Sequence, residues 1–194
     1  MIRFVLALVL VAVAAGLGAC SPKIGDSCSA SSDCSQDNSR VCDTFSPGGY
    51  CTVQGCDFGT CPDGAVCVQF FPGIENAASC KDMNGNPSQM LCPSSEFCTV
   101  ASQCAPRSIE QRFCMATCSS DGDCRDGYEC RTQKLQIAHG GQPVADPNLD
   151  PNATSTSAPT TAFCAGRRSC SVDADCDSGE RCNPFNRACE PIPG

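Results

Sequence analysis

Cysteine content constrains this chain more than any other feature of its sequence. The 194 residues contain 21 cysteines, more than one residue in ten. Such a density is typical of small exported proteins in which disulfides replace a large hydrophobic core. Metal binding is the main alternative, but it requires ligands at C-x2-C spacing or histidine partners. The chain has no C-x2-C pair and a single histidine, His139. We therefore expect disulfides, and neither a metal ion nor another cofactor.

The cysteines from Cys28 onward fall into five groups of four, and each group predicts a small module closed by two disulfides. The predicted modules span residues 28–51, 56–80, 92–114, 118–164 and 170–189. Their cysteines are Cys28, Cys34, Cys42, Cys51, Cys56, Cys61, Cys67, Cys80, Cys92, Cys98, Cys104, Cys114, Cys118, Cys124, Cys130, Cys164, Cys170, Cys176, Cys182 and Cys189. Four cysteines allow three pairings, and the sequence leaves the choice among them open.

Three of these groups share more than their spacing. The segments CDFGTCPDGAVC, CSSDGDCRDGYEC and CSVDADCDSGERC place a glycine three residues after the second cysteine, at Gly64, Gly127 and Gly179. A glycine at a fixed position in a short loop indicates a turn with positive φ. In the first group Asp37 and Asn38 stand near this position, and both residue types tolerate that conformation. An aspartate precedes the second cysteine at Asp33, Asp123 and Asp175, so these groups read as copies of one repeat.

The third group lacks both features, which leaves the boundary between the second and third modules open. The segment CPSSEFC, from Cys92, is similar to CPDGAVC, from Cys61. This similarity would shift the frame and make Cys80 the first cysteine of its module. Two frames therefore compete between Cys80 and Cys118.

The C-x5-C-x5-C spacing, with its D-x-D-C and x-x-G-x-x-C elements, resembles the small cysteine-rich modules related to the Dickkopf amino-terminal domain and the EB module. The resemblance runs from about Cys28 to Cys189. Modules of this kind occur as repeats in secreted proteins and in bacterial lipoproteins. The resemblance implies an extracellular interaction module without enzymatic activity.

We expect a small disulfide-rich fold of tandem cysteine-rich modules with short β-hairpins and little regular secondary structure. Apolar residues come in short bursts such as Ala65–Phe71, bounded by turn residues, and no long helical period follows the first 20 residues. Modules of this size cannot build a self-sufficient core. Disulfides, at about 2–4 kcal/mol each, would supply the missing stability.

One long spacing interrupts the pattern of cysteines. Residues 131–163 separate Cys130 from Cys164 and are rich in Pro, Ala, Ser and Thr. A segment of this composition buries too little apolar surface to offset the entropy of ordering it. The sequence therefore predicts a disordered insert at 131–163 within the fourth module.

The first 19 residues predict an export signal, with one positive charge followed by an unbroken run of apolar or small residues. Residues 17–20, LGAC, resemble the lipobox of bacterial lipoproteins, in which the cysteine receives acyl groups such as palmitate and begins the mature chain. This interpretation leaves twenty cysteines for disulfides, whereas ordinary signal cleavage leaves one without a partner. We expect a lipoprotein signal peptide at 1–19, lipidation of Cys20 and a tether at 20–27.

The formal net charge of −8 argues against nucleic acid and anionic lipid surfaces as partners. Attachment to a membrane must then come from the lipid anchor, because two or more acyl chains hold a protein stably. Ser21 follows Cys20 in place of the aspartate associated with retention in the inner membrane. We expect an exported chain, lipid-anchored to the bacterial envelope, with the outer membrane favoured.

Catalytic residues are not evident in the sequence, and we predict that the chain is not an enzyme. His139 lies inside the predicted insert, where no rigid surroundings would hold a catalytic base, so we expect a surface histidine. Neither G-x-S-x-G nor H-E-x-x-H occurs. Aspartates gather around Asp82, Asp121 and Asp173, but calcium-loop spacing fails at each of them, and we interpret them as solvated turn residues.

Apolar side chains that have no core to enter are the candidates for a contact surface. Val68, Phe70 and Phe71 would either form a contact patch or cover the disulfides of their own module, and we expect the second. The loop Phe45–Tyr50 is the candidate for an inhibitor-type contact.

Together these features predict an envelope-anchored lipoprotein that presents disulfide-rich modules to a protein or glycan partner, outside the cell or in the periplasm. Two alternatives stay open. One is a secreted or tethered protease-inhibitor or toxin-like ligand, and the other is a calcium-dependent adhesin.

Overall fold

The structure is a computed structural model that describes residues 22–74, 76–148, 161–168, 170, 172–176, 178–183 and 188–192. The predicted signal peptide and Cys20 lie outside the described residues. The described part consists of short strands, 3₁₀-helices and one seven-residue α-helix, α2 (Gln133–His139), which confirms the predicted fold class. No helix within these residues is long and apolar enough to cross a membrane.

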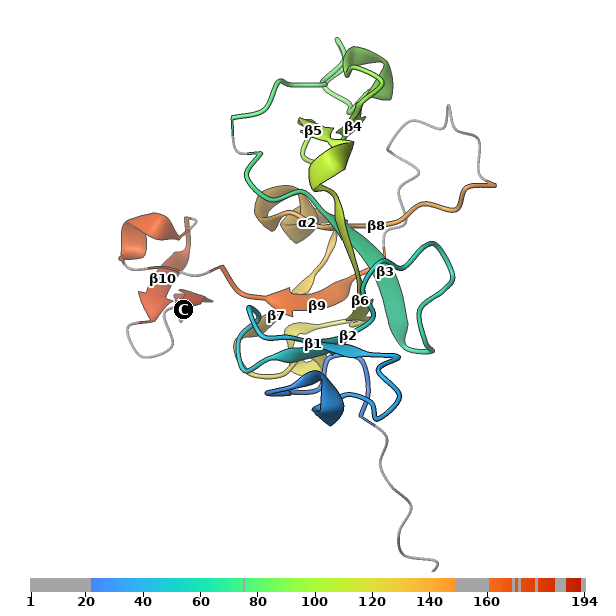
Figure 1. The fold of residues 1–194 in the computed structure, drawn as a ribbon. Helices are drawn as coiled ribbons and strands as arrows, with labels where there is room; N and C mark the ends of the chain where they lie inside the picture. The colour runs from blue at the N-terminus through green and yellow to red at the C-terminus, as the bar shows by residue number, and fades with distance from the viewer. Residues whose placement is uncertain are drawn as a thin grey trace, which may run out of the picture.

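The strands pair antiparallel into small sheets (Figure 1). Four sheets are two-stranded, namely β1 (Val41–Asp43) with β2 (Tyr50–Thr52), β4 (Glu96–Cys98) with β5 (Cys104–Pro106), β7 (Tyr128–Arg131) with β9 (Phe163–Gly166), and β10 (Glu180–Asn183) with β11 (Ala188–Pro191). The fifth has the order β6 (Gln111–Ala116), β3 (Ala65–Phe70), β8 (Gln142–Pro143). Each sheet contains one hairpin-like pair that carries two cysteines.

All twenty cysteines from Cys28 onward form disulfides. Once two module boundaries are corrected, as described below, every module pairs its first cysteine with the third and its second with the fourth. The pairs are Cys28–Cys42, Cys34–Cys51, Cys56–Cys67, Cys61–Cys114, Cys80–Cys98, Cys92–Cys104, Cys118–Cys130, Cys124–Cys164, Cys170–Cys182 and Cys176–Cys189. The third and fourth cysteines lie opposite each other in the register of their strands, as Cys42 does with Cys51. The hairpin thus brings the two disulfides of a module side by side.

The pairing corrects two predicted module boundaries. Cys61 bonds to Cys114, whereas Cys80 bonds to Cys98 within the intervening segment. Residues 80–104 therefore form a complete module inserted between the third and fourth cysteines of a module that spans 56–114. The frame 56–80 and 92–114 is wrong, and the shifted frame with Cys80 as a first cysteine is right. We call residues 80–104 the inserted module.

A 3₁₀-helix between the first and second cysteines recurs in four modules. These helices are η1 (Ser31–Asp33), η2 (Gln89–Leu91), η4 (Asp121–Asp123) and η6 (Asp173–Asp175), while η3 (Arg107–Ile109) follows the inserted module. The first residue of each helix accepts a hydrogen bond from the N–H of the third cysteine, as Asp121 does from Cys130 at 2.8 Å. This contact fixes the helix against the hairpin.

The aspartate before the second cysteine closes the turn that starts this helix. Asp33 accepts the N–H groups of Ser29 and Ala30 at 2.8 and 3.0 Å, and Asp123 does the same for the two serines before η4. These bonds hold the pKa of both carboxyls below the usual value, because they favour the ionised form. Asp33 and Asp123 are therefore turn residues that satisfy backbone donors.

The repeated glycine also has the conformation that its position predicted. Gly64, Gly127 and Gly179 have φ of 77°, 82° and 93°, and Asn38 takes their place in the first module with φ of 58°. This turn leads into the strand that carries the third cysteine. The predicted position with positive φ is therefore confirmed as a feature of the repeat.

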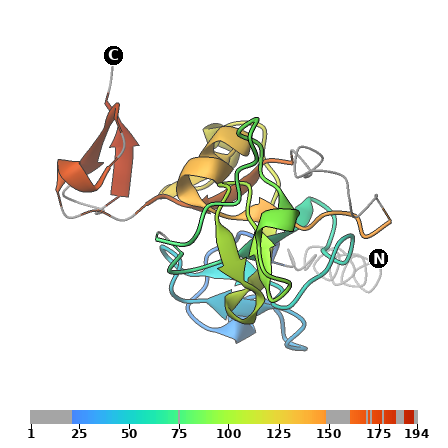
Figure 2. The ribbon, with the colours of Figure 1, turned by 90° about the horizontal axis from the view of Figure 1, so that it is seen from above.

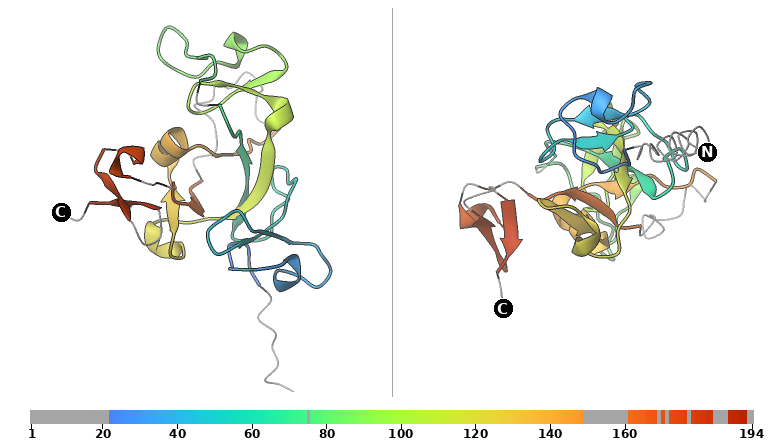
Figure 3. Two further views of the ribbon diagram at one scale, coloured as in Figure 1. Left: turned by 60° about the vertical axis from the view of Figure 1, so that its left-hand side comes forward. Right: turned by 90° about the horizontal axis from the view of Figure 1, so that it is seen from below.

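One hydrophobic core is shared by three modules, which therefore do not fold as separate units. They are the modules 28–51, 56–114 and 118–164. Tyr50 stacks on Tyr128 with ring centroids 5.3 Å apart, and its hydroxyl accepts the N–H of Ala116 at 2.9 Å. Val68 and Phe163 are fully buried in the same core. Figure 2 and Figure 3 show that the fifth module, with β10 and β11, lies to one side of this body.

Parts of the predicted disordered insert and of the predicted tether belong to the fold. Within the predicted disordered insert, α2 and β8 are ordered, and Gln136 is buried with its side-chain amide donating to the carbonyls of Arg131 and Thr161. Residues 149–160 lie outside the described residues. Within the predicted tether, Ile24 is buried in the core and the N–H of Gly25 donates to the carbonyl of Cys51 at 2.9 Å. Specific hydrogen bonds, and the burial of Ile24, order these two segments in a way that their composition did not predict.

Candidate functional site

A cluster of buried charged side chains lies where α2 meets β7. One carboxylate oxygen of Glu129, Oε1, accepts Nε–H of Arg131 at 2.9 Å and lies 2.8 Å from Nδ1 of His139. The side chains of Glu129, Arg131 and His139 are only 4 %, 10 % and 3 % exposed. His139 is therefore buried, and its prediction as a surface histidine is wrong.

Arg131 uses its remaining donors to tie three chain segments together. Its Nη1 donates to the carbonyls of His139 and Gly140, each at 3.0 Å, and its Nη2 donates to the carbonyl of Gly166 at 2.9 Å. Gly140 ends α2 with a φ of 80°. A guanidinium thus caps the last carbonyls of the helix and joins it to the end of β9.

Burial and pairing act in opposite directions on the acidity of this cluster. Burial raises the pKa of Glu129, but the hydrogen bond from His139 and the positive charge of Arg131 outweigh it, so the pKa lies below the usual value. Burial lowers the pKa of Arg131, against the opposing effect of Glu129. The cluster is a buried ion pair, whose main effect is to fix the position of α2.

A cavity of about 390 Å³ opens beside this cluster. Its walls come from the end of β3, from residues 99–103 of the inserted module, from residues 136–142 around α2, and from residues 166–168. Three arginines line it, Arg131, Arg167 and Arg168, and none of the described lining residues is acidic. Arg131 is paired with Glu129 and Arg167 with Asp121, so the cavity presents guanidinium groups that are held by acidic partners outside its lining. We call it the arginine cavity.

A second hollow, of about 490 Å³, lies between the first and fourth modules and differs in character. Asp26, Asp33 and Asp123 line it together with Arg125. The guanidinium of Arg125 lies 4.3 Å from the ring centroid of Tyr128 and donates to the carbonyl of Pro47 at 3.0 Å. These groups are occupied in holding the two modules together, so the hollow is a module junction.

The apolar residues considered for a contact patch pack against their surroundings, with Val68 buried and Phe70 and Phe71 partly buried. Val68 lies in the core that also contains cysteines of its own module, which agrees with the expected covering role. Phe70 contacts the edge of Phe163 from the fourth module, with centroids 6.2 Å apart. Phe71 stacks on Phe97 of the inserted module at 5.6 Å. These aromatic rings join modules and do not form an open surface.

Large exposed apolar side chains are found instead on the inserted module. Met83 and Met90 are fully exposed and Leu91 is about half exposed. Asp82, directly before Met83, shapes a turn, since its carboxylate accepts the N–H groups of Asn84 and Asn86 at 2.9 and 2.8 Å. The sequence did not single out these methionines because the predicted frame left Met83 and Met90 between two modules.

The loop Phe45–Tyr50, the second predicted contact, is only partly available. Phe45 is fully exposed, but Tyr50 is buried in the shared core. The carbonyls of Pro47, Gly48 and Gly49 are hydrogen-bonded by Arg125. The loop therefore presents one aromatic side chain on a backbone fixed from behind.

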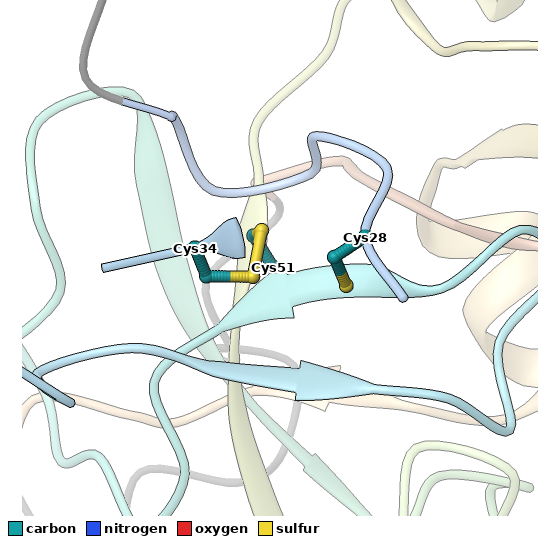
Figure 4. Close-up of side chains that lie close together, drawn as sticks. All are labelled: Cys28, Cys34 and Cys51. Carbon is teal, nitrogen blue, oxygen red and sulfur yellow. A yellow bond between two sulfur atoms is a disulfide. The ribbon is translucent and has the colours of Figure 1, made fainter. Parts of the chain in front are cut away.

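The sulfur atoms of each module form a tight group. In the first module, Sγ of Cys28 lies close to the Cys34–Cys51 disulfide (Figure 4), with all three sulfur atoms within 4.8 Å of one another. The other four modules repeat this arrangement. Since every one of these sulfurs belongs to a disulfide, the groups serve as crosslinks of the fold.

These features define a small disulfide-rich protein of five two-disulfide modules, one nested within another. Comparison with protein-family models, with curated proteins and with solved structures found no match for the chain.

Proposed function

We propose that the chain is an exported bacterial lipoprotein, anchored in the envelope through Cys20, that uses its inserted module to contact another macromolecule. The observation that carries this proposal is the placement of Met83, Met90 and Leu91 in solvent on a module held by two disulfides. The inserted module, with β4 and β5, lies at the opposite end of the body from the first module, with β1 and β2 (Figure 1).

The anchor and the contact surface would then face opposite directions. Residues 22–27 pack against the first module, as the hydrogen bond from Gly25 to Cys51 illustrates, so a lipid on Cys20 would hold this module close to the membrane. The inserted module would point away from the bilayer, where a partner has access to it. A lipid anchor of two or more acyl chains would keep this orientation for long periods.

Exposed methionines suit a binding surface because their side chains are flexible and polarisable, and adapt to the shape of a partner. Burying a side chain of this size contributes about 1.5–3 kcal/mol. Two fully exposed methionines and a half-exposed leucine could therefore contribute most of the affinity of a modest interface.

Crosslinking on intact cells tests the proposal, with a Met83→Asp/Met90→Asp variant and a Phe45→Asp control. Both changes place a charge on an exposed apolar position. We expect the double variant to lose its crosslinked partner while the control retains it. Retention of the same partner by the double variant would contradict the proposal.

A protease-inhibitor or toxin-like ligand is the second candidate, favoured by the fully exposed Phe45 on its fixed loop. Loss of the partner in the Phe45→Asp variant alone would select this candidate. A panel of proteases assayed with the full oxidised chain provides an independent test.

A further inference from the structure

We propose that the arginine cavity is a binding site for a carboxylated sugar residue. The cavity is separate from the exposed methionines of the inserted module, so this inference goes beyond the proposed function and stands or falls independently of it. The argument rests on the guanidinium group of Arg167, on the amide groups of the cavity and on its aromatic wall.

The guanidinium groups of the cavity suit an anionic ligand. Arg167 and Arg168 line it, and Nη2 of Arg167 lies 2.8 Å from Oδ2 of Asp121, which holds the guanidinium in place. The side chain of Arg167 is 16 % exposed, and Asp121 contacts only its Nη2, which leaves further N–H donors of this guanidinium for a ligand. A planar guanidinium can bind a carboxylate through two parallel N–H donors, which gives both affinity and orientation.

The amide groups of the cavity suit a ligand with hydroxyls. Gln69 and Gln142 are buried and line the wall, as does Gln136, whose NH₂ group already donates to the carbonyls of Arg131 and Thr161. The side-chain oxygen of Gln142 accepts the N–H of Val100 at 2.8 Å, which orients its NH₂ group as a donor. Buried amides held in this way select ligands that return a hydrogen bond, because a ligand without one leaves them unsatisfied.

An aromatic ring completes the wall. Phe71 lines the cavity and is held by its stacking on Phe97, with a 10° angle between the ring planes. The face of an aromatic ring carries partial negative charge and packs well against the weakly positive C–H groups of a sugar ring. A guanidinium for the carboxylate, amides for the hydroxyls and a ring for the C–H face together match an acidic monosaccharide unit.

The site is also preorganised, which lowers the entropic cost of binding. Its walls come from the second, inserted and fourth modules, each closed by disulfides, and Arg131 fixes α2 through three backbone carbonyls. A cavity of about 390 Å³ is within the range of small-ligand sites.

The test is an NMR and calorimetric titration of the full oxidised chain with glucuronic acid. Glucose, which lacks the carboxylate, and acetate, which lacks the ring and hydroxyls, are the ligand controls. We expect glucuronic acid to shift the amide signals of residues 99–103, 136–142 and 166–168, and to bind about tenfold more tightly than either control.

Two variants link binding to the cavity. Arg167→Gln/Arg168→Gln should weaken glucuronic acid binding by about tenfold or more, whereas Arg181→Gln, on the exposed strand β10 of the fifth module, should leave it within about twofold. A third variant, Arg167→Lys/Arg168→Lys, keeps the charge and guards against loss of fold, and should restore part of the affinity.

Several results would overturn the proposal. If acetate and glucuronic acid bind equally tightly, the cavity is a simple anion site. If Arg181→Gln weakens glucuronic acid binding as much as the cavity variants do, or if the amide shifts are confined to residues outside the cavity, the ligand binds elsewhere. The crosslinking experiment with the methionine variants does not depend on any of these results.

Discussion

Replacement of Arg131 by methionine should destabilise the shared core strongly, although no apolar side chain is lost. The substitution leaves Glu129 ionised and buried at 4 % exposure without its guanidinium partner. Breaking a buried ion pair on one side costs about 3–5 kcal/mol. It also removes the donor from the carbonyls of His139, Gly140 and Gly166.

The variant Glu129→Gln/Arg131→Met separates these two effects. It removes the unpaired charge and leaves only the carbonyls that lose their donor, so its cost should fall to about 1–3 kcal/mol. Arg107→Met is the matched control, because the side chain of Arg107 is exposed and lies over the ring of Phe97, with Cζ 5.4 Å from the ring centroid. Its cost should be about 1 kcal/mol or less.

Denaturation by guanidinium chloride with the disulfides intact measures these free energies. The pH dependence gives a second readout. In the native chain the pKa of Glu129 is lowered, so the stability that its ionised form contributes is lost as the pH falls below the usual glutamate value. In Arg131→Met only His139 opposes the effect of burial, so the pKa of Glu129 should lie higher than in the native chain, and the difference in stability between variant and native chain should narrow in acid. A cost below about 1 kcal/mol for Arg131→Met, or a double variant no more stable than the single one, would refute the reasoning.

Two further predictions follow from burial. Mild reduction followed by alkylation should label Cys28 and Cys42 before Cys34, because the first disulfide is half-buried and the sulfur of Cys34 is inaccessible, and earlier labelling of Cys34 would contradict this. Burial raises the pKa of Tyr50 to about 12 and also raises that of Tyr128, so a rapid ultraviolet titration should place both ionisations above the usual value. The stability contributed by these neutral phenols is lost as the pH rises from about 10 through the folded pKa values, and titration of the folded chain at about 10 would exclude their burial.

The features that the sequence predicted well are those set by local chemistry. A glycine three residues after the second cysteine predicts a turn with positive φ, and Gly64, Gly127 and Gly179 have positive φ. The density of cysteines requires a disulfide scaffold, because modules this small cannot otherwise offset the entropy of folding. Both inferences depend only on residues within one module, so they do not depend on where the module lies in the chain.

The nesting of one module in another could not be obtained from spacing. The Cys61–Cys114 bond closes 53 residues and Cys56–Cys67 closes 11. The entropy of loop closure grows by only about 0.6 kcal/mol for each doubling of length, so a long loop is hardly penalised relative to a short one. The signal that identified the frame was the local similarity of CPSSEFC to CPDGAVC.

The misjudged insert shows a different limit. Its first part is ordered by the guanidinium of Arg131 and the amide of Gln136, each of which satisfies backbone carbonyls from distant segments. Composition measures how much apolar surface a segment can bury, but it does not reveal which polar side chains meet their partners. The buried His139 and the arginine cavity were missed for the same reason.

A peptide map of the oxidised chain without reductant tests the nested architecture most directly. The account predicts a linked pair of peptides containing Cys61 and Cys114, with the bonds of Cys80 to Cys98 and Cys92 to Cys104 confined to the inserted module. A peptide that links Cys61 to Cys80, or Cys98 to Cys114, would contradict it.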